Sequence, residues 1–248
     1  MPNVADAILL CGGAGLRLRS VTGKTPKALA NIAGRPFLAL VLSQLRRHGF
    51  QRVILAVGYG NDAIRSHFGD RAFDLQLRYS IEAIPLGTGG ALRKAVDLIE
   101  SDSALIMNGD SYTDADLTAF AADYRESGAD ASILVVPADG RIDCGLVSVD
   151  PSGKVMGFKE KQSSVGTQHV NAGIYMASKN ILGDIPTGVQ VSLEEELFPQ
   201  WLVEGRYLRA FRHPGACIDI GTAERYRSAQ DSLANAELGA NLSGPEGH

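Results

Sequence analysis

An excess of positive charge and long apolar runs are both missing from this 248-residue sequence. Its 24 lysines and arginines are outnumbered by 28 aspartates and glutamates, which gives a net charge of −4 at pH 7, whereas nucleic-acid-binding domains are basic. No apolar run approaches the roughly 20 residues that cross a bilayer, and no secretion signal precedes Ala5. We therefore expect neither a nucleic-acid partner nor a membrane partner.

Cysteine is scarce as well. Cys11, Cys144 and Cys217 are odd in number, scattered, and without the spacing of a zinc site. Such cysteines are typical of reduced thiols in a cytoplasmic protein, which is the location we expect. Nothing in the sequence pairs Cys11 with a base, so we interpret it as a small buried residue.

Internal repeats and domain linkers are absent too. A chain of this length can form one large domain or two small ones. Without a linker, we expect a single domain over residues 1–235. The residues at 236–248, rich in Gly, Asn and Ser, are typical of a flexible tail.

The apolar runs that are present predict the fold class. Residues 7–10, 52–57, 75–81 and 103–107 are predicted strands, and they alternate with segments of helical periodicity. Strands that are apolar nearly throughout indicate a largely parallel sheet covered on both faces. The predicted class is α/β, a Rossmann-like three-layer α/β/α sandwich with a mixed, mainly parallel central sheet.

A glycine loop follows the first predicted strand. Gly12, Gly13 and Gly15 fall within four residues. Glycine permits positive φ, and its missing Cβ lets a ligand approach the backbone. Consecutive N–H groups in such a turn bind anions, while Arg17 adds a forked positive charge and Lys27 a compact one. The combination is typical of a triphosphate site.

Two common phosphate-binding motifs do not fit this loop. A P-loop requires G-x-x-x-x-G-K-S/T, and Gly23-Lys24-Thr25 lacks the first glycine. A dinucleotide fingerprint requires a third glycine where Leu18 stands, and an acidic residue where Arg35 and Pro36 stand. The remaining alternative is a glycine turn between a strand and a helix with incidental cations.

The loop carries a family resemblance. The stretch Gly12-Gly13-x-Gly15-x-Arg17-Leu18, followed by Pro26-Lys27, resembles the signature G-G-x-G-T-R-L…P-K of the sugar-1-phosphate nucleotidyltransferases. Leu16 stands where threonine is customary, a change that leaves the glycines and the cations intact. Further matches extend over residues 5–232. The resemblance implies a GT-A-like nucleotidyltransferase fold.

A second part of the expected site follows the third predicted strand, at Glu82, Pro85 and Gly87. The carboxyl edge of a parallel sheet is where α/β folds bind ligands, and the resemblance implies that this segment frames the nucleotide base. A carboxylate only accepts hydrogen bonds. Guanine offers two adjacent donors, so Glu82 favours GTP over UTP or dTTP. The alternative is that Glu82 ends its strand in solvent.

Two aspartates are implied as Mg²⁺ ligands. Asp110 lies in Asn108-Gly109-Asp110, which matches the family's x-G-D, and Asp219 begins a match to its D-x-G-T. A carboxylate at the end of a buried strand is costly unless it is hydrated, paired or bound to a metal. Asp114 and Asp116 are better explained as helix caps. The resemblance also places Leu10 and Asn108 beside the nucleotide.

The second half of the chain carries the segments that the resemblance assigns to the sugar phosphate. Residues 158–161 match the family's F-x-E-K, and 171–175 match its N-A-G-I-Y. The implied sugar-phosphate ligands are Gly145, Glu160, Lys161, Asn171 and Glu194. Lys161 also has a physical reason, because a cation must separate two phosphates that repel each other.

The acidic run that contains Glu194 has a second explanation. Ser192 is a predicted N-cap, and Glu195 stands at the capping-box position. Carboxylates are also favoured at a helix N-terminus by the helix dipole. We include Glu194 because the family uses an acid here near the sugar.

Together these motifs predict an enzyme that joins a sugar 1-phosphate to a nucleoside triphosphate, with GTP favoured and Mg²⁺ as cofactor. Segments 17–21 and 79–90 look most like the members that act on D-glycero-α-D-manno-heptose 1-phosphate. One alternative is a guanylyltransferase that acts on mannose 1-phosphate. Another is an enzyme that transfers a uridylyl or thymidylyl group to glucose 1-phosphate or N-acetylmuramate 1-phosphate. An alternative of a different class is a non-catalytic nucleotide-sugar sensor. The sequence does not decide whether the protein forms a homo-oligomer. The predicted catalytic residues are Arg17, Lys27, Asp110 and Lys161.

Overall fold

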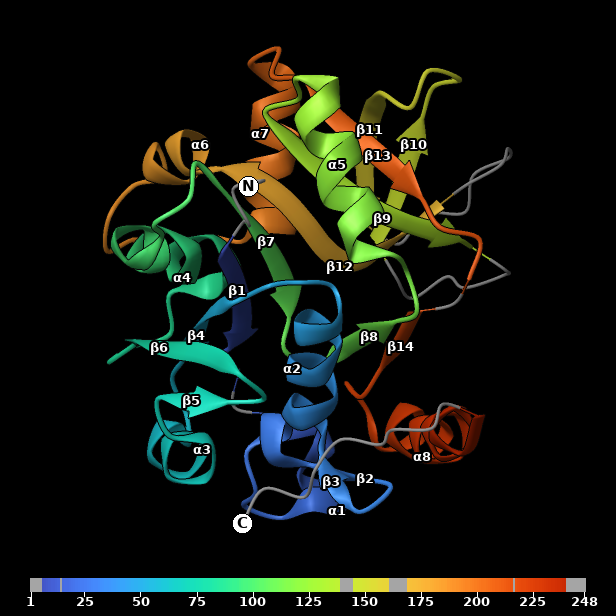
Figure 1. The fold of residues 1–248 in the computed structure, drawn as a ribbon. Coiled ribbons are helices and arrows are strands. Elements are labelled where there is room, and N and C mark those ends of the chain that lie inside the picture. The colour runs from blue at the N-terminus through green and yellow to red at the C-terminus, as the bar shows by residue number, and fades with distance from the viewer. Residues whose placement is uncertain (1–5, 14, 139–144, 161–168, 216, 240–248) are drawn as a thin grey trace.

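A mixed ten-stranded sheet forms the centre of the molecule, with strand order β11-β10-β12-β7-β1-β4-β6-β5 and with β9 pairing with both β12 and β13 (Figure 1). The computed structural model describes residues 6–13, 15–138, 145–160, 169–215 and 217–239, except for the side chains of 159–160 and 234–239. The strands of this sheet are β1 (Asp6–Cys11), β4 (Arg52–Val57), β5 (Arg71–Ala72), β6 (Leu75–Ile81), β7 (Ser103–Asn108), β9 (Ala131–Pro137), β10 (Gly145–Val149), β11 (Val155–Glu160), β12 (His169–Ser178) and β13 (Leu208–Arg212).

Helices cover both faces of the sheet, so the predicted three-layer sandwich is confirmed. Side chains of β1 alternate: Leu9 packs into a core cluster with α2, α3, α5 and α8, and Ile8 into a second cluster with α4, α6 and α7. The helices are α1 (Arg19–Thr22), α2 (Phe37–Arg47), α3 (Asn61–Phe68), α4 (Gly87–Ala95), α5 (Leu117–Ser127), α6 (Lys179–Gly183), α7 (Phe198–Val203) and α8 (Ala223–Gly239). Each face therefore has its own hydrophobic core.

The middle of the sheet is parallel, which decides where the loops lie. β1 pairs in parallel with β4 on one side and with β7 on the other, and β4 pairs in parallel with β6. Their carboxyl ends therefore meet at one edge. Two hydrogen bonds extend this edge beyond the strands, from Gly109 N–H to Leu10 O (3.0 Å) and from Glu82 N–H to Val57 O (2.8 Å).

Two short ribbons lie outside the main sheet. β2 (Asn31–Ile32) pairs with β3 (Arg35–Pro36), and β8 (Ser111–Thr113) pairs with β14 (Cys217–Asp219). The second ribbon is antiparallel and places Asp219 opposite Ser111, the residue after Asp110. It therefore brings together two segments that are more than a hundred residues apart in the chain.

The predicted strands agree with the structure to within about two residues, the usual uncertainty of element boundaries. The terminal helix differs. α8 continues to Gly239 and so includes the first residues of the expected tail. Residues 240–248 lie outside the described part of the chain. None of the helices in the described part has the length and hydropathy needed to cross a bilayer.

The opposite edge of the sheet is closed around Asp6, whose side chain is 1% exposed. Its carboxylate accepts hydrogen bonds from Glu100 N–H (2.6 Å), Ser101 N–H (2.9 Å) and Arg52 Nε (2.5 Å). Burial alone would raise the pKa of Asp6, but these hydrogen bonds outweigh it and the pKa is lowered. The ionised carboxylate therefore links β1, β4 and the segment that leads into β7.

We expect Asp6→Asn to lower the free energy of unfolding by about 2–4 kcal/mol at pH 7, because it leaves buried donors without a charged acceptor. Since the folded-state pKa is lowered, this stabilisation is present above the unfolded carboxyl pKa of about 4 and is lost as the pH falls through the folded-state value. Urea unfolding at pH 7 and at about pH 3 measures the difference. The exposed Asp97 gives the matched control, Asp97→Asn. Equal effects of the two substitutions at pH 7 would contradict the prediction.

Candidate active site

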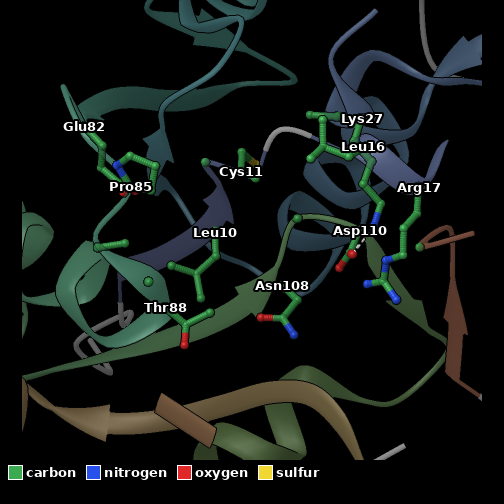
Figure 2. A pocket seen from close by; sticks show the side chains of 18 of the residues that line it. Leu10, Cys11, Leu16, Arg17, Lys27, Glu82, Pro85, Thr88, Asn108 and Asp110 are labelled. Atoms are coloured by element: carbon green, nitrogen blue, oxygen red, sulfur yellow. Dashed lines mark hydrogen bonds and ion pairs between the residues drawn. The ribbon is translucent and has the colours of Figure 1, made fainter. Parts of the chain in front are cut away.

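A cavity of about 630 Å³ opens at the carboxyl edge of the parallel strands. Every residue predicted to bind the nucleotide lines it: Leu10, Gly12, Gly13, Gly15, Arg17, Glu82, Pro85, Gly87, Asn108 and Asp110. Lys27 lines it as well. Figure 2 shows Glu82 and Pro85 at one end of this cavity and Arg17, Lys27 and Asp110 at the other. The two ends are chemically distinct, one a carboxylate beside proline and the other rich in cations.

The glycine loop forms the wall between these ends. Gly15 has φ of 57°, a left-handed conformation that suits glycine, and its carbonyl accepts a hydrogen bond from Leu18 N–H (2.9 Å). At Gly12 a Cβ atom would lie 2.8 Å from Oε1 of Glu82. The absence of a side chain at Gly12 therefore lets the Glu82 carboxylate lie against the loop.

Two cations line the end of the cavity opposite Glu82. The Lys27 ammonium forms an ion pair with the Asp110 carboxylate (Figure 2). Arg17 is exposed, and no acidic side chain in the described ranges forms an ion pair with it. Its guanidinium is therefore available to an anion that enters the cavity.

The two predicted metal ligands lie at the same end of the β8–β14 ribbon, with Asp110 directly before β8 and Asp219 as the last residue of β14. Ile220 N–H donates to the carbonyl of Asp110 (3.0 Å). The Asp219 carboxylate accepts hydrogen bonds from Gly221 N–H (2.8 Å) and from Arg225 Nη1 (2.8 Å). Each aspartate thus carries a compensating cation, Lys27 on Asp110 and Arg225 on Asp219.

This donor set fits Mg²⁺. The ion prefers oxygen ligands and is usually held by one or two carboxylates together with substrate phosphates. No group of three or more His, Cys, Asp or Glu side chains within the described residues could hold a metal by itself. Asp110 and Asp219 are therefore suited to an ion that arrives with phosphate oxygens.

The other end of the cavity is built around Glu82. Its Oε2 accepts a hydrogen bond from Leu86 N–H (3.0 Å). Burial raises the pKa of Glu82, although the Leu86 N–H and the charge of Lys94 act in the opposite direction. The alternative that Glu82 only ends a strand in solvent is wrong, because its carboxylate is half-buried and lines the cavity.

The predicted sugar-phosphate residues are partly brought together. The Asn171 side chain donates to the hydroxyl of Tyr175 (2.7 Å), which donates to Glu194 (3.0 Å). Gly145 lies close to Asn171, since a Cβ at Gly145 would be 3.9 Å from that of Asn171. Glu160 pairs with Gly145 across β10 and β11, and only its backbone is described. Lys161 lies outside the described residues.

The cap at Ser192 differs in one respect from the expectation. Ser192 Oγ accepts from Glu195 N–H (3.1 Å), as predicted, but the side chain that accepts from Ser192 N–H (2.8 Å) is that of Glu196 rather than that of Glu195. The cause is a π-helical turn at Leu193–Leu197, in which Leu197 N–H donates to Ser192 O (3.0 Å). The wider turn moves the reciprocal carboxylate on by one residue.

The interpretations of two other residues are confirmed. Asp116 caps α5 by accepting from Thr118 N–H (2.9 Å) and Ala119 N–H (3.0 Å). Cys11 is buried, and burial raises the pKa of its thiol to about 12, so it is no nucleophile at neutral pH. Asp114 differs from its expected role as a helix cap, because Asp116 is the N-cap of α5 and Asp114 pairs with His213 (2.7 Å) outside the cavity lining.

The glycines of α4 have a role that the sequence did not reveal. Val191 N–H donates to Leu86 O (2.9 Å), and Gly89 N–H donates to Val191 O (2.9 Å). A Cβ at Gly87 would lie 2.5 Å from Val191 O, and one at Gly90 would lie 2.5 Å from Val189 O. These glycines therefore allow the segment 189–191, called the strap below, to dock on the helix by its backbone.

The lining residues that sequence analysis did not assign to the site include Thr88, Gln190 and Leu16. Thr88 stands among the glycines of α4, where its position at the start of a helix was a usable signal. Gln190 arrives with the strap, about a hundred residues later, and no local motif marks it. Leu16 was noted only as a departure from the family pattern, yet it lines the cavity and is 67% exposed.

A mainly parallel α/β/α sandwich with a glycine loop, two cations and two aspartates at one edge defines a nucleotidyltransferase. The family model described as nucleotidyl transferase matches residues 6–236. The chain therefore belongs to the nucleotidyl transferase family.

Its relatives include guanylyltransferases. The chain is 37% identical to mannose-1-phosphate guanylyltransferase of Mycobacterium tuberculosis over 246 residues. This alignment covers 98% of this chain and 68% of that protein. The chain is 34% identical over 229 residues to D-glycero-alpha-D-manno-heptose 1-phosphate guanylyltransferase of Aneurinibacillus thermoaerophilus, covering 92% and 98%. The crystal structure of HddC from Yersinia pseudotuberculosis complexed with GMP-PN has a TM-score of 0.81 at 33% identity, covering 93% of this chain and all of that one (100%).

We expect Gly87→Ala to lower the free energy of unfolding by about 1–3 kcal/mol, because φ is +70° and the new Cβ would collide with the backbone of the strap. Gly183→Ala is the matched control, since its Cβ meets no atom within 4 Å. Denaturant unfolding of both variants measures the effect. A Gly87→Ala protein as stable as Gly183→Ala would contradict this account of the strap.

Proposed function

We propose that this protein is a guanylyltransferase that joins D-glycero-α-D-manno-heptose 1-phosphate to GTP and releases pyrophosphate. The observation that carries the proposal is a single cavity with the Glu82 carboxylate at one end and the glycine loop, Arg17 and Lys27 at the other. A nucleoside triphosphate needs both environments at once, a hydrogen-bond acceptor for its base at one end and cations for its phosphates at the other. The curated relatives with guanylyltransferase activity support the same assignment.

Glu82 supports guanine in particular. A carboxylate accepts hydrogen bonds and cannot donate them when ionised, and guanine presents N1–H and N2–H₂ side by side. Uracil and thymine present one N–H between two carbonyl oxygens, which the carboxylate would repel. Leu86 N–H holds one Glu82 oxygen from the side of the protein, so the carboxylate is already oriented.

In the proposed reaction, an oxygen of the sugar 1-phosphate attacks the α-phosphorus of GTP in line. The bond from the α-phosphorus to the bridging oxygen breaks, and pyrophosphate leaves with the electron pair. A phosphate dianion is already ionised near neutral pH, so catalysis consists of positioning and charge neutralisation.

The residues of the cavity divide that task. The N–H groups of the loop and Arg17 would hold the β- and γ-phosphates, and Lys27 would neutralise charge at the α-phosphate. Lys161 would hold the attacking phosphate. Asp110 and Asp219 would hold Mg²⁺, which supplies further positive charge at the α-phosphate when it is bound.

The sugar side is assigned to Gly145, Glu160, Asn171 and Glu194. Heptose 1-phosphate is preferred because segments 17–21 and 79–90 look most like the heptose members of the family. Mannose 1-phosphate is the second candidate, and the 37% identity to the Mycobacterium tuberculosis mannose-1-phosphate guanylyltransferase favours it.

The test is a pyrophosphate-release assay with Mg²⁺ that crosses GTP, ATP, UTP, CTP and dTTP with heptose, mannose and glucose 1-phosphates. We expect release with GTP and heptose 1-phosphate, and none from an Asp110→Asn control. Release with UTP or dTTP and glucose 1-phosphate would keep the enzyme class and contradict the role of Glu82. Nucleotide binding without release for any pair would favour the sensor.

We further expect Glu82→Gln to raise the KM for GTP about tenfold or more with a smaller effect on kcat, since an amide offers one acceptor where guanine needs two. The pKa of Glu82 is raised, so lowering the pH toward that value protonates the carboxylate and raises the wild-type KM for GTP. The variant lacks this titration, so the two KM values converge at low pH. The exposed Glu126 provides the control, Glu126→Gln. Parallel pH profiles for wild type and Glu82→Gln would refute the assignment.

A further inference from the structure

The carboxylate of Glu194 accepts hydrogen bonds from hydroxyl groups in three parts of the chain. Its Oε1 accepts from the Tyr175 hydroxyl (3.0 Å), and its Oε2 accepts from Thr88 Oγ1 (2.7 Å) and from Ser192 Oγ (3.3 Å). Thr88 begins α4 and lines the cavity, whereas Tyr175 lies on β12. Glu194 thus connects the wall of the nucleotide cavity to the predicted sugar side.

The direction of these hydrogen bonds is fixed by their other partners. Tyr175 accepts from Asn171 Nδ2 (2.7 Å), and Thr88 accepts from Leu193 N–H (2.7 Å). An N–H group can only donate, so each hydroxyl uses a lone pair for that bond and turns its single hydrogen to Glu194. The chain of bonds therefore has one polarity, with Glu194 as the final acceptor.

The same bonds fix the amide of Asn171. Its Nδ2 donates to Tyr175, and its Oδ1 accepts from Gly173 N–H (2.9 Å). If the Asn171 amide were flipped, its NH₂ group would face Gly173 N–H, donor against donor. Tyr175 would also lose the N–H group that donates to its hydroxyl. Among the described residues, no further partner takes the second N–H or the second lone pair of the Asn171 amide, so both are available to a ligand hydroxyl.

Tyr175 itself cannot be a ligand of the sugar. It is 1% exposed, and its ring packs against that of Phe198 with centroids 5.2 Å apart. Burial, followed by the charge of Glu194, raises the pKa of Tyr175 well above its ordinary value, so the hydroxyl keeps its proton. Its ring is held in the core, while its hydroxyl bonds to Asn171 and Glu194, the two residues assigned to the sugar side.

We propose that Tyr175 and Thr88 are positioning residues for the sugar 1-phosphate. Together they hold the Glu194 carboxylate from opposite sides, and Tyr175 passes that constraint on to the Asn171 amide. The substrate then meets two polar groups that are already oriented, which lowers the entropic cost of binding it. This inference rests on the proposed function of the cavity.

The test uses Tyr175→Phe and Thr88→Val, which remove a hydroxyl and keep most of the side-chain volume. We expect either substitution to raise the KM for the sugar 1-phosphate about tenfold, while the KM for GTP and kcat at saturation change by less than about twofold. Thr88→Ser should restore the wild-type KM, because serine can make both bonds of Thr88. The sugar phosphate used is whichever one the wild-type enzyme turns over.

Tyr124→Phe is the matched control. Tyr124 is also buried, but it lies on α5, and its hydroxyl contacts the Asp130 carbonyl (3.5 Å) away from the cavity. If Tyr175→Phe raises both KM values equally, leaves both unchanged, or behaves like Tyr124→Phe, the inference is overturned. Failure of Thr88→Ser to restore the KM would overturn it as well. A wild-type enzyme that turns over no sugar phosphate would instead refute the proposed function itself.

Discussion

The parallel pairing of β1 with β4 and β7 is the constraint on which the site depends. Parallel strands end at the same edge, so the glycine loop after β1, Glu82 after β6 and Asp110 after β7 meet there although they are far apart in the chain. The Asp6 carboxylate closes the other edge and links the same strands. A shift in any of these registers would separate the base end of the cavity from its phosphate end.

Charge is balanced before any ligand binds. Asp110 and Asp219 lie at the same end of the β8–β14 ribbon, where like charges repel, but Lys27 forms an ion pair with Asp110 and Arg225 forms one with Asp219. A triphosphate and its metal cation would bring both signs of charge into this region. The lysine and arginine side chains could then pair with phosphate and the two aspartates with the cation, so that no charge is left buried without a partner. Arg17 is the exception, an exposed cation whose role awaits the ligand.

The sequence was sufficient for features whose cause is local. The apolar runs predicted the strands, the glycine loop predicted residues that line the cavity, and Asp116 was identified as a cap from its neighbours alone. What it missed depends on contacts between distant segments: Gln190 reaches the cavity only because the strap docks on α4, and the burial of Tyr175 depends on Phe198. The π-helical turn puts Glu196 in the place expected for Glu195 in the cap. This turn could not be foreseen from the sequence, because a π-helical turn has no clear local pattern.

The strap has a consequence for divergence within the family. It is fastened to α4 by main-chain hydrogen bonds across glycines, and of its three residues only Val191 has a buried side chain. Val189 and Gln190 are exposed. Their side chains can therefore be exchanged without loosening the attachment, while the backbone keeps presenting whatever replaces them at the same place. The cavity can thus acquire a new side chain at position 190 at little cost to stability, which is a route by which one scaffold can come to accept different ligands.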